Sequence, residues 1–220
     1  MGTNREYKEA ALEYLRGNWP AAIIASAIYF VVLWLVIGCQ YTPALMGNTI
    51  GVDAAVSGSG FLVAVLVLGP LSIGYANALR LLCNTGNANV TANMVHLSTN
   101  RYLHLVGVYL LMTVKIILWS LLFIVPGVMK AFSYAMTPFI AVEHPEMSAS
   151  EVLAKSSEMM YGHRMELFML YLSFIGWFLL SMLTAFVGLI ILQPYVLCSV
   201  VEFYNEIKGP SGPTNIILEQ

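Results

Sequence analysis

The chain has 220 residues, of which 59% are hydrophobic and 10% are charged, and its mean hydropathy is +0.76. Soluble domains are about 45–50% apolar and about 25% charged, so this composition excludes an ordinary soluble fold and predicts an all-α, polytopic transmembrane bundle. The net charge of −2 excludes the strongly basic surface typical of nucleic-acid binding. Cys39, Cys83 and Cys198 lack the spacing of a disulfide framework or a zinc site.

Residues 1–19 are predicted to form an amphipathic helix that lies in the membrane interface. Their charges are of both signs, and the apolar run that follows is longer than the core of a signal peptide, about 7–15 residues. A solvated leader helix is the alternative. The residues at helical spacing that suggest an interfacial face are Tyr7, Ala11, Tyr14, Leu15, Asn18 and Trp19.

Six apolar runs follow along the chain. A bilayer core about 30 Å thick requires about 20 apolar residues in a helix, with a range of about 17–25. We therefore predict that residues 20–206 form a transmembrane bundle of about six spans in three hairpins. Residues 207–220 have turn and linker chemistry and are predicted to be a flexible tail. The six predicted spans are 20–38, 60–82, 103–125, 128–142, 167–183 and 185–203.

The stretch 121–130, LLFIVPGVMK, is where the third span is predicted to turn back. A continuous helix over residues 103–142 would be about 60 Å long, twice the membrane thickness. Pro126 suits the first turn of a new helix, and Gly127 permits a tight backbone. These two residues are therefore the predicted hinge. The alternative is a five-span chain in which residues 116–142 form one kinked helix.

Between the fourth and fifth spans, residues 148–163 are predicted to form an amphipathic helix on the membrane surface. Ser148 and Glu151 have the spacing of a capping box. Glu151 and Lys155 are spaced for an i,i+4 ion pair. The residues predicted to share the apolar face are Val152, Leu153, Ser156, Met159 and Met160.

The distribution of lysine and arginine predicts that both termini lie on the inner side of the membrane. The outer loops then carry no basic residue apart from Lys130, which lies one turn past the hinge. Five spans would send Lys155 and Arg164 outside, so six spans are preferred. Eight of the ten basic residues lie inside in the six-span chain: Arg5, Lys8, Arg16, Arg80, Arg101, Lys155, Arg164 and Lys208.

Lys115 is the most unusual position. It is the thirteenth residue of the third predicted span, about 18 Å from its start and so near the bilayer centre. A charge at that depth is energetically costly, so we take Lys115 as a candidate functional residue. No acidic residue is predicted at matching depth. A functional cavity, a neutral lysine, a water-filled space and a different helix depth remain alternatives.

Three other residues are candidates for lipid contact. Lys130 is predicted to extend its ammonium to the outer headgroups, with binding of a lipid phosphate as the alternative. His163 and Arg164 lie where the surface helix meets the fifth span, a usual place for headgroup contacts. His163, His144, Glu143 and Glu146 lack a zinc spacing, so no metal site is predicted.

From about Arg101 onward the chain resembles the bacterial membrane family called domain of unknown function 975. The stretches that carry the resemblance are LWSLLFIVPGVMKAFSYAMTPFI, SSEMMYGHRMELFMLYLSFIGWFLL and PYVLCSVVEFY, and YLRGNWPAA and GPLSIGYANALR fit it too. Family members more often have a lysine where Tyr161 stands. The resemblance implies a multi-pass protein of the bacterial cytoplasmic membrane, and it implies no established activity, catalytic residue or ligand.

Three classes of function follow. The short loops favour a non-catalytic role, as a transport accessory or another membrane-associated component. The alternative is an interaction scaffold or a protective, immunity-like protein. A lipid-acting enzyme is less favoured, because neither His-Glu-x-x-His nor Gly-x-Ser-x-Gly occurs. We therefore predict no catalytic residue or cofactor. The predicted partners are the lipid bilayer and a second copy or another membrane protein, but no nucleic acid.

Overall fold

A computed structural model describes residues 2–45, 62–86, 89–184 and 187–209, and every regular element within these ranges is a helix. Six helical segments in these ranges are long and apolar enough to cross a membrane, which confirms the all-α fold and the number of spans. The predicted flexible tail begins too early, because residues 207 and 208 continue the last helix; residues 210–220, and residues 46–61 between the first two spans, lie outside the described residues. The six segments are Trp19–Val36, Val65–Thr85, Tyr102–Leu122, Ile124–Glu143, Arg164–Leu183 and Val187–Lys208.

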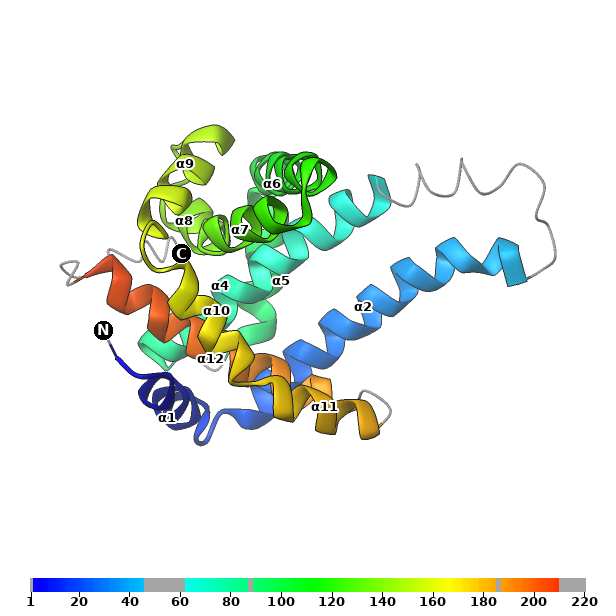
Figure 1. The fold of residues 1–220 in the computed structure, drawn as a ribbon. Helices are drawn as coiled ribbons and strands as arrows, with labels where there is room; N and C mark the ends of the chain where they lie inside the picture. Colours follow the sequence, from blue (N-terminus) through cyan, green and yellow to red (C-terminus); the bar gives the residue numbers. More distant parts are fainter. Residues whose placement is uncertain (1, 46–61, 87–88, 185–186, 210–220) are drawn as a thin grey trace.

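Several of these segments are interrupted (Figure 1). The fourth span is two helices joined by a turn, and so is the fifth. In chain order the helices are α1 (Asn4–Leu15), α2 (Trp19–Leu45), the π-helical turn η1 (Ala64–Leu68), α4 (Gly69–Thr85), α5 (Val90–Asn100), α6 (Tyr102–Leu122), α7 (Ile124–Ser133), α8 (Thr137–Glu143), α9 (Ala149–Met159), α10 (Arg164–Leu172), α11 (Ile175–Leu183) and α12 (Val187–Lys208).

The N-terminal helix α1 is stabilised at its start and packed along its length. Thr3 and Glu6 form a capping box, so two backbone N–H groups that lack helical partners are satisfied. The face with Tyr7, Ala11 and Leu15 is buried, and α1 packs chiefly against α12. The helix was predicted correctly, but protein covers its apolar face. Its position in the membrane interface stays a prediction.

The segment after α4 differs from the prediction. Residues 90–100 were expected to belong to an inner loop, but they form α5, which packs along α4. Pro70 has no N–H to donate to the Leu66 carbonyl, and the Tyr102 hydroxyl donates to this carbonyl at 2.8 Å. The start of α6 therefore lies beside the start of α4, whereas strict alternation across the membrane would have separated them.

The helices consequently do not form a bundle of parallel hairpins. In Figure 1, α6 points along the line of sight, whereas α2 and α4 lie across it. The ring of Tyr109, on α6, packs so closely on α4 that a Cβ at Gly69 would lie 2.8 Å from its Cδ1 atom. The physical reason for the difference is α5, because a helix returns the chain along α4 where the sequence suggested a loop.

The chain reverses after α6 at Phe123, three residues before the predicted hinge. Phe123 is extended (φ −156°, ψ 145°), and α7 begins at Ile124, so Pro126 lies in the first turn of α7. A Cβ at Gly127 would lie 2.7 Å from the Cα atom of Ser120. Gly127 is therefore required by the close approach of α6 and α7, and the backbone turn itself belongs to Phe123.

The predicted helix over 148–163 is observed as α9. Ser148 and Glu151 form the capping box, and Val152, Leu153, Ser156 and Met160 are buried, as predicted. The predicted Glu151–Lys155 pair is wrong, because Glu151 accepts hydrogen bonds from Ser148, and Lys155 contacts His144. The apolar face of α9 packs on α6, α7 and α8.

Burial divides the molecule into two regions. The packed core consists of residues 73–83, 133–143, 152–160 and 198–208, where most side chains are buried. The apolar rim consists of residues 24–35, 110–129, 175–184 and 187–191, where large apolar side chains such as Trp34, Leu121 and Leu183 are exposed. A rim of this composition is suited to contact with lipid.

Candidate functional site

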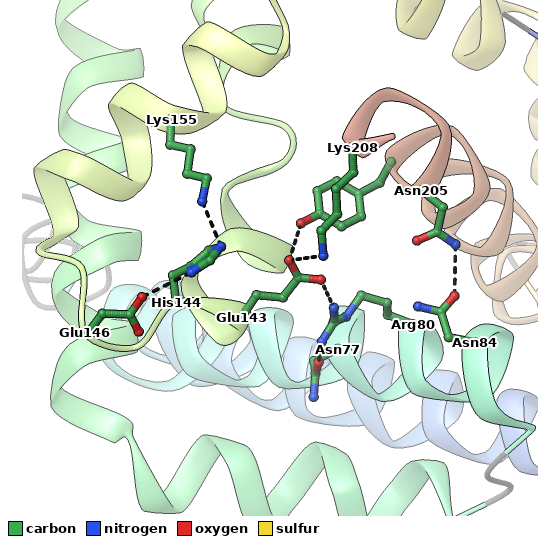
Figure 2. Close-up of polar contacts among 10 residues, drawn as sticks. Asn77, Arg80, Asn84, Glu143, His144, Glu146, Lys155, Asn205 and Lys208 are labelled. Atoms are coloured by element: carbon green, nitrogen blue, oxygen red, sulfur yellow. Dashed lines mark hydrogen bonds and ion pairs between the residues drawn. The ribbon is translucent and has the colours of Figure 1, made fainter. Parts of the chain in front are cut away.

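The most densely bonded polar group in the packed core is Glu143, the last residue of α8. Its side chain is 7% exposed. One carboxylate oxygen, Oε2, accepts hydrogen bonds from the Tyr204 hydroxyl at 2.8 Å and from Lys208 Nζ at 2.7 Å. The other, Oε1, accepts from the Arg80 guanidinium. Figure 2 shows Glu143 between Arg80 of α4 and Lys208 of α12.

Helical spacing explains how each partner reaches this carboxylate. Tyr204 and Lys208 are four residues apart on α12, so they share one helical face. Asn77 and Arg80 are three residues apart on α4, and Arg80 Nη2 donates to Asn77 Oδ1 at 3.0 Å. Asn205 extends the same junction by donating to Asn84 Oδ1 at 2.9 Å. The single side chain of Glu143 thus binds both α4, through Arg80, and α12, through Tyr204 and Lys208.

This cluster is a buried structural ion-pair network. Two cations share one anion, and Arg80 and Glu143 are both 7% exposed in their side chains, whereas Lys208 is 22% exposed. A buried carboxylate is tolerated because its charge is paired and its oxygens accept several hydrogen bonds. Removing one charged member of the network would leave the charge of its partner buried and uncompensated. The cluster therefore fixes α4, α8 and α12 relative to one another.

A second polar group lies next to the first in sequence. His144 Nδ1 lies 3.1 Å from Glu146 Oε1, and His144 Nε2 lies 2.8 Å from Lys155 Nζ. A hydrogen bond to its own backbone, and then the nearby His144 and Lys155, lower the pKa of Glu146. A lysine ammonium only donates, so this geometry requires His144 to accept at Nε2. The group ties the loop after α8 to α9.

His163 was considered with His144, Glu143 and Glu146 as a metal cluster, and the structure does not gather these four. His163 Nδ1 lies 3.0 Å from Glu166 Oε2 at the start of α10. Within the described residues, no group of three His, Cys, Asp or Glu side chains is arranged to hold a metal ion. Arg164, beside it, has its guanidinium carbon 5.9 Å from the centre of the Tyr161 ring.

The two predicted lysines lie on neighbouring helices. Lys115 is half-buried on α6, and it makes no hydrogen bond or ion pair with any residue in the part of the chain that the structure describes. Lys130 is half-buried on α7, with Nζ 5.3 Å from the centre of the Trp119 ring and 5.8 Å from that of Tyr134. These distances suit cation–π contacts.

Comparison with known proteins found a family match for the second part of the chain. Residues 124–211 match a family model described as "Protein of unknown function (DUF975)". This segment belongs to the DUF975 family. The resemblance seen in the sequence is thus confirmed for these residues, and YLRGNWPAA and GPLSIGYANALR lie before the match. No curated protein and no solved structure matches the chain.

The DUF975 segment supplies Glu143, Tyr204 and Lys208, and the N-terminal part of the chain supplies Arg80. Sequence reasoning missed this cluster. A signal for it existed, because Arg80, Glu143 and Lys208 are charges at the ends of the second, fourth and sixth spans. Charges at matching ends of alternate spans can meet at one face. The candidates singled out earlier, Lys115, Lys130, His163 and Arg164, are not brought into this cluster.

The DUF975 segment also forms most of an apolar groove of about 480 Å³. Phe30 of α2 closes one side of it. Gln193 is the polar residue in its lining, and its Oε1 atom is buried without a hydrogen-bond partner among the described residues. The other lining residues are Tyr171, Leu172, Phe174, Ile175, Phe178, Leu189, Leu192, Val196 and Leu197.

Proposed function

We propose that this protein is a non-catalytic integral membrane protein of a bacterial cytoplasmic membrane, and that it serves as an accessory component of a transport assembly. In this proposal both termini face the cytoplasm, and the protein acts through contacts of its spanning helices with those of a partner. The six apolar helices support the membrane location. The excess of basic residues in the predicted inner segments supports the orientation.

The observation that carries the proposal is the groove beside Gln193. Its walls are almost wholly apolar, and Gln193 is part of the lining with its Oε1 atom buried and unpaired among the described residues. Hydrogen bonds from glutamine and similar side chains join helices within membranes. A partner helix that fills the groove would pack against Gln193, and rotation of this side chain toward the groove would let its amide oxygen accept a hydrogen bond from the partner.

The same structure makes the scaffold alternative less favourable. A scaffold would hold its partner through exposed apolar faces of amphipathic helices, which here are α1 and α9. Tyr7, Ala11 and Leu15 of α1 are buried, and so are Val152 and Leu153 of α9. Since the protein's own helices cover these faces, the groove is the better candidate for contact with a partner.

Site-specific photo-crosslinking in native membranes tests the proposal. A photoreactive residue at Phe178, which lines the groove, should crosslink to a discrete partner membrane protein, and this adduct should be lost when Gln193→Leu is added. The matched control is the same residue at Leu179, which lies next in sequence outside the groove lining and is 60% exposed. It should give no such adduct. Lipid adducts alone at Phe178, or adducts between copies of this chain alone, would contradict the proposal.

A second test addresses orientation. Single cysteines at Phe123 and Ser150, both exposed, should react with impermeant reagents from opposite sides of intact cells. Phe123 is preferable to Gly127, because any side chain at Gly127 would collide with Ser120. The labelling result bears directly on the topology, because strict alternation of the spans would place the starts of α4 and α6 on opposite sides of the membrane, whereas they lie side by side. Labelling of both positions from one side would overturn the proposed orientation.

A further inference from the structure

Lys115 and Lys130 both lie near one exposed tryptophan, Trp119. Trp119 is 39% exposed, and Lys130 Nζ lies 5.3 Å from the centre of its ring. Lys115 is four residues before Trp119 on α6, so the two side chains share a helical face with about 5–6 Å between their Cβ atoms. The geometry therefore places two ammonium groups within reach of one point on the surface.

The surroundings of these lysines are apolar. Val114, Ile117, Leu118, Leu121 and Met129 are all at least 46% exposed, and all belong to the apolar rim. A cation among lipid-facing side chains is costly unless it reaches an anion or water. Lysine stems are long enough to direct the ammonium along the surface toward such a group.

Among the described residues, no carboxylate forms an ion pair with Lys115 or Lys130. Residues 54–142 contain no aspartate or glutamate, so α6 and α7 carry two positive charges and no negative one. The next acidic residue along the chain is Glu143, whose carboxylate is already bonded to Arg80, Tyr204 and Lys208. The described part of the chain therefore leaves Lys115 and Lys130 open to an anion from the surroundings.

We propose that Lys115 and Lys130 together bind the phosphate of an anionic phospholipid, with the exposed Trp119 at the level of its headgroup. In this proposal Lys115 lies nearer the membrane surface than its place in the predicted span suggested. Tryptophan and tyrosine are enriched at that level of the membrane, and basic pockets between spanning helices bind anionic headgroups. A second copy of this chain is a poor occupant, because the same surface would bring two more positive charges. The proposal is independent of the partner proposed for the groove.

Lipid titration of the purified protein tests this site. Phosphatidylglycerol, and separately phosphatidylcholine, is added in mild detergent, and the midpoint of thermal unfolding gives the apparent affinity. Phosphatidylglycerol should stabilise the wild type and phosphatidylcholine should not. Each of Lys115→Gln and Lys130→Gln should weaken the response about fivefold, and the double variant about 25-fold. Lys130→Arg should retain it.

Lys155→Gln is the matched control, because Lys155 is another half-buried lysine and its ammonium contacts His144 away from this surface. It should bind phosphatidylglycerol as the wild type does. An unchanged lipid response in the double variant would overturn the proposal, whatever its basal stability. Equal stabilisation by inorganic phosphate without lipid would also overturn it, because the site would then take a free anion.

Discussion

The packed core and the apolar rim are built from similar residues that face different surroundings. Leu79 of α4 is fully buried, whereas Leu179 of α11 is 60% exposed. In the core, apolar side chains touch one another and charged groups are paired within the protein. In the rim, apolar side chains face outward, and neither Lys115 within it nor Lys130 beside it is paired with an acid in the part of the chain that the structure describes. Hydropathy alone does not distinguish the two regions, because both are apolar. They differ in whether their charged groups are paired within the protein.

The largest expected effect comes from Glu143→Gln in the core. The substitution leaves Arg80 and Lys208 without their anion, and removing one partner of a buried pair costs about 3–5 kcal/mol. We expect a large fall in the midpoint of thermal unfolding in detergent. Glu158→Gln, at an exposed position on α9, is the control and should leave the midpoint almost unchanged. Similar behaviour of the two variants would show that the cluster does not hold the core.

A pair of leucine truncations compares the regions directly. Leu79→Ala opens a cavity in the core and should lower the free energy of unfolding by about 2–5 kcal/mol. Leu179→Ala removes the same atoms from an exposed side chain and should change it by less than about 0.5 kcal/mol. Both are measured by denaturation in the same detergent. Equal losses of unfolding free energy in the two variants would contradict this comparison, because Leu179 would then be as well packed as Leu79.

Gly127→Ala tests the boundary between the regions, where α7 leaves the rim. The added Cβ would lie 2.7 Å from the Ser120 Cα atom, so α6 and α7 must separate. The expected loss is about 1–3 kcal/mol. Gly107→Ala is the control on α6, since nothing lies within 4 Å of a Cβ there. A neutral Gly127→Ala would mean that the two helices are not in close contact at this point.

The smallest expected effect concerns the exposed cap of α9, at the edge of the core. Hydrogen bonds from Ser148 lower the pKa of Glu151. A lowered pKa in the folded state means that the stabilisation is present at neutral pH and is lost as the pH falls through that pKa. The thermal midpoints of the wild type and Glu151→Gln should therefore differ slightly at pH 7 and converge at acidic pH. A difference independent of pH would contradict this account of the cap.

The sequence was sufficient for features that depend on local pattern. The six apolar runs and the α9 cap, with Ser148 and Glu151, follow from composition and spacing that a single segment contains. The Glu143 cluster could not be found this way, because Arg80 and Lys208 approach it from helices far apart in the chain. The start of α6 was predicted to within one residue along the chain, but its position beside the start of α4 was not, because residues 90–100 resemble a loop when their packing against α4 is unknown.

The bond between the two ends of the chain has a consequence for biosynthesis. The backbone N–H of Gly2 donates to Glu206 Oε1 at 2.6 Å, although the two residues are 204 positions apart. At about 5–20 residues per second, α12 emerges roughly 10–40 s after α1. During that time the buried face of α1 lacks its native cover. Assembly of the protein is therefore completed only after translation of the last span, and a chain that stops before α12 would leave its first helix exposed to quality control.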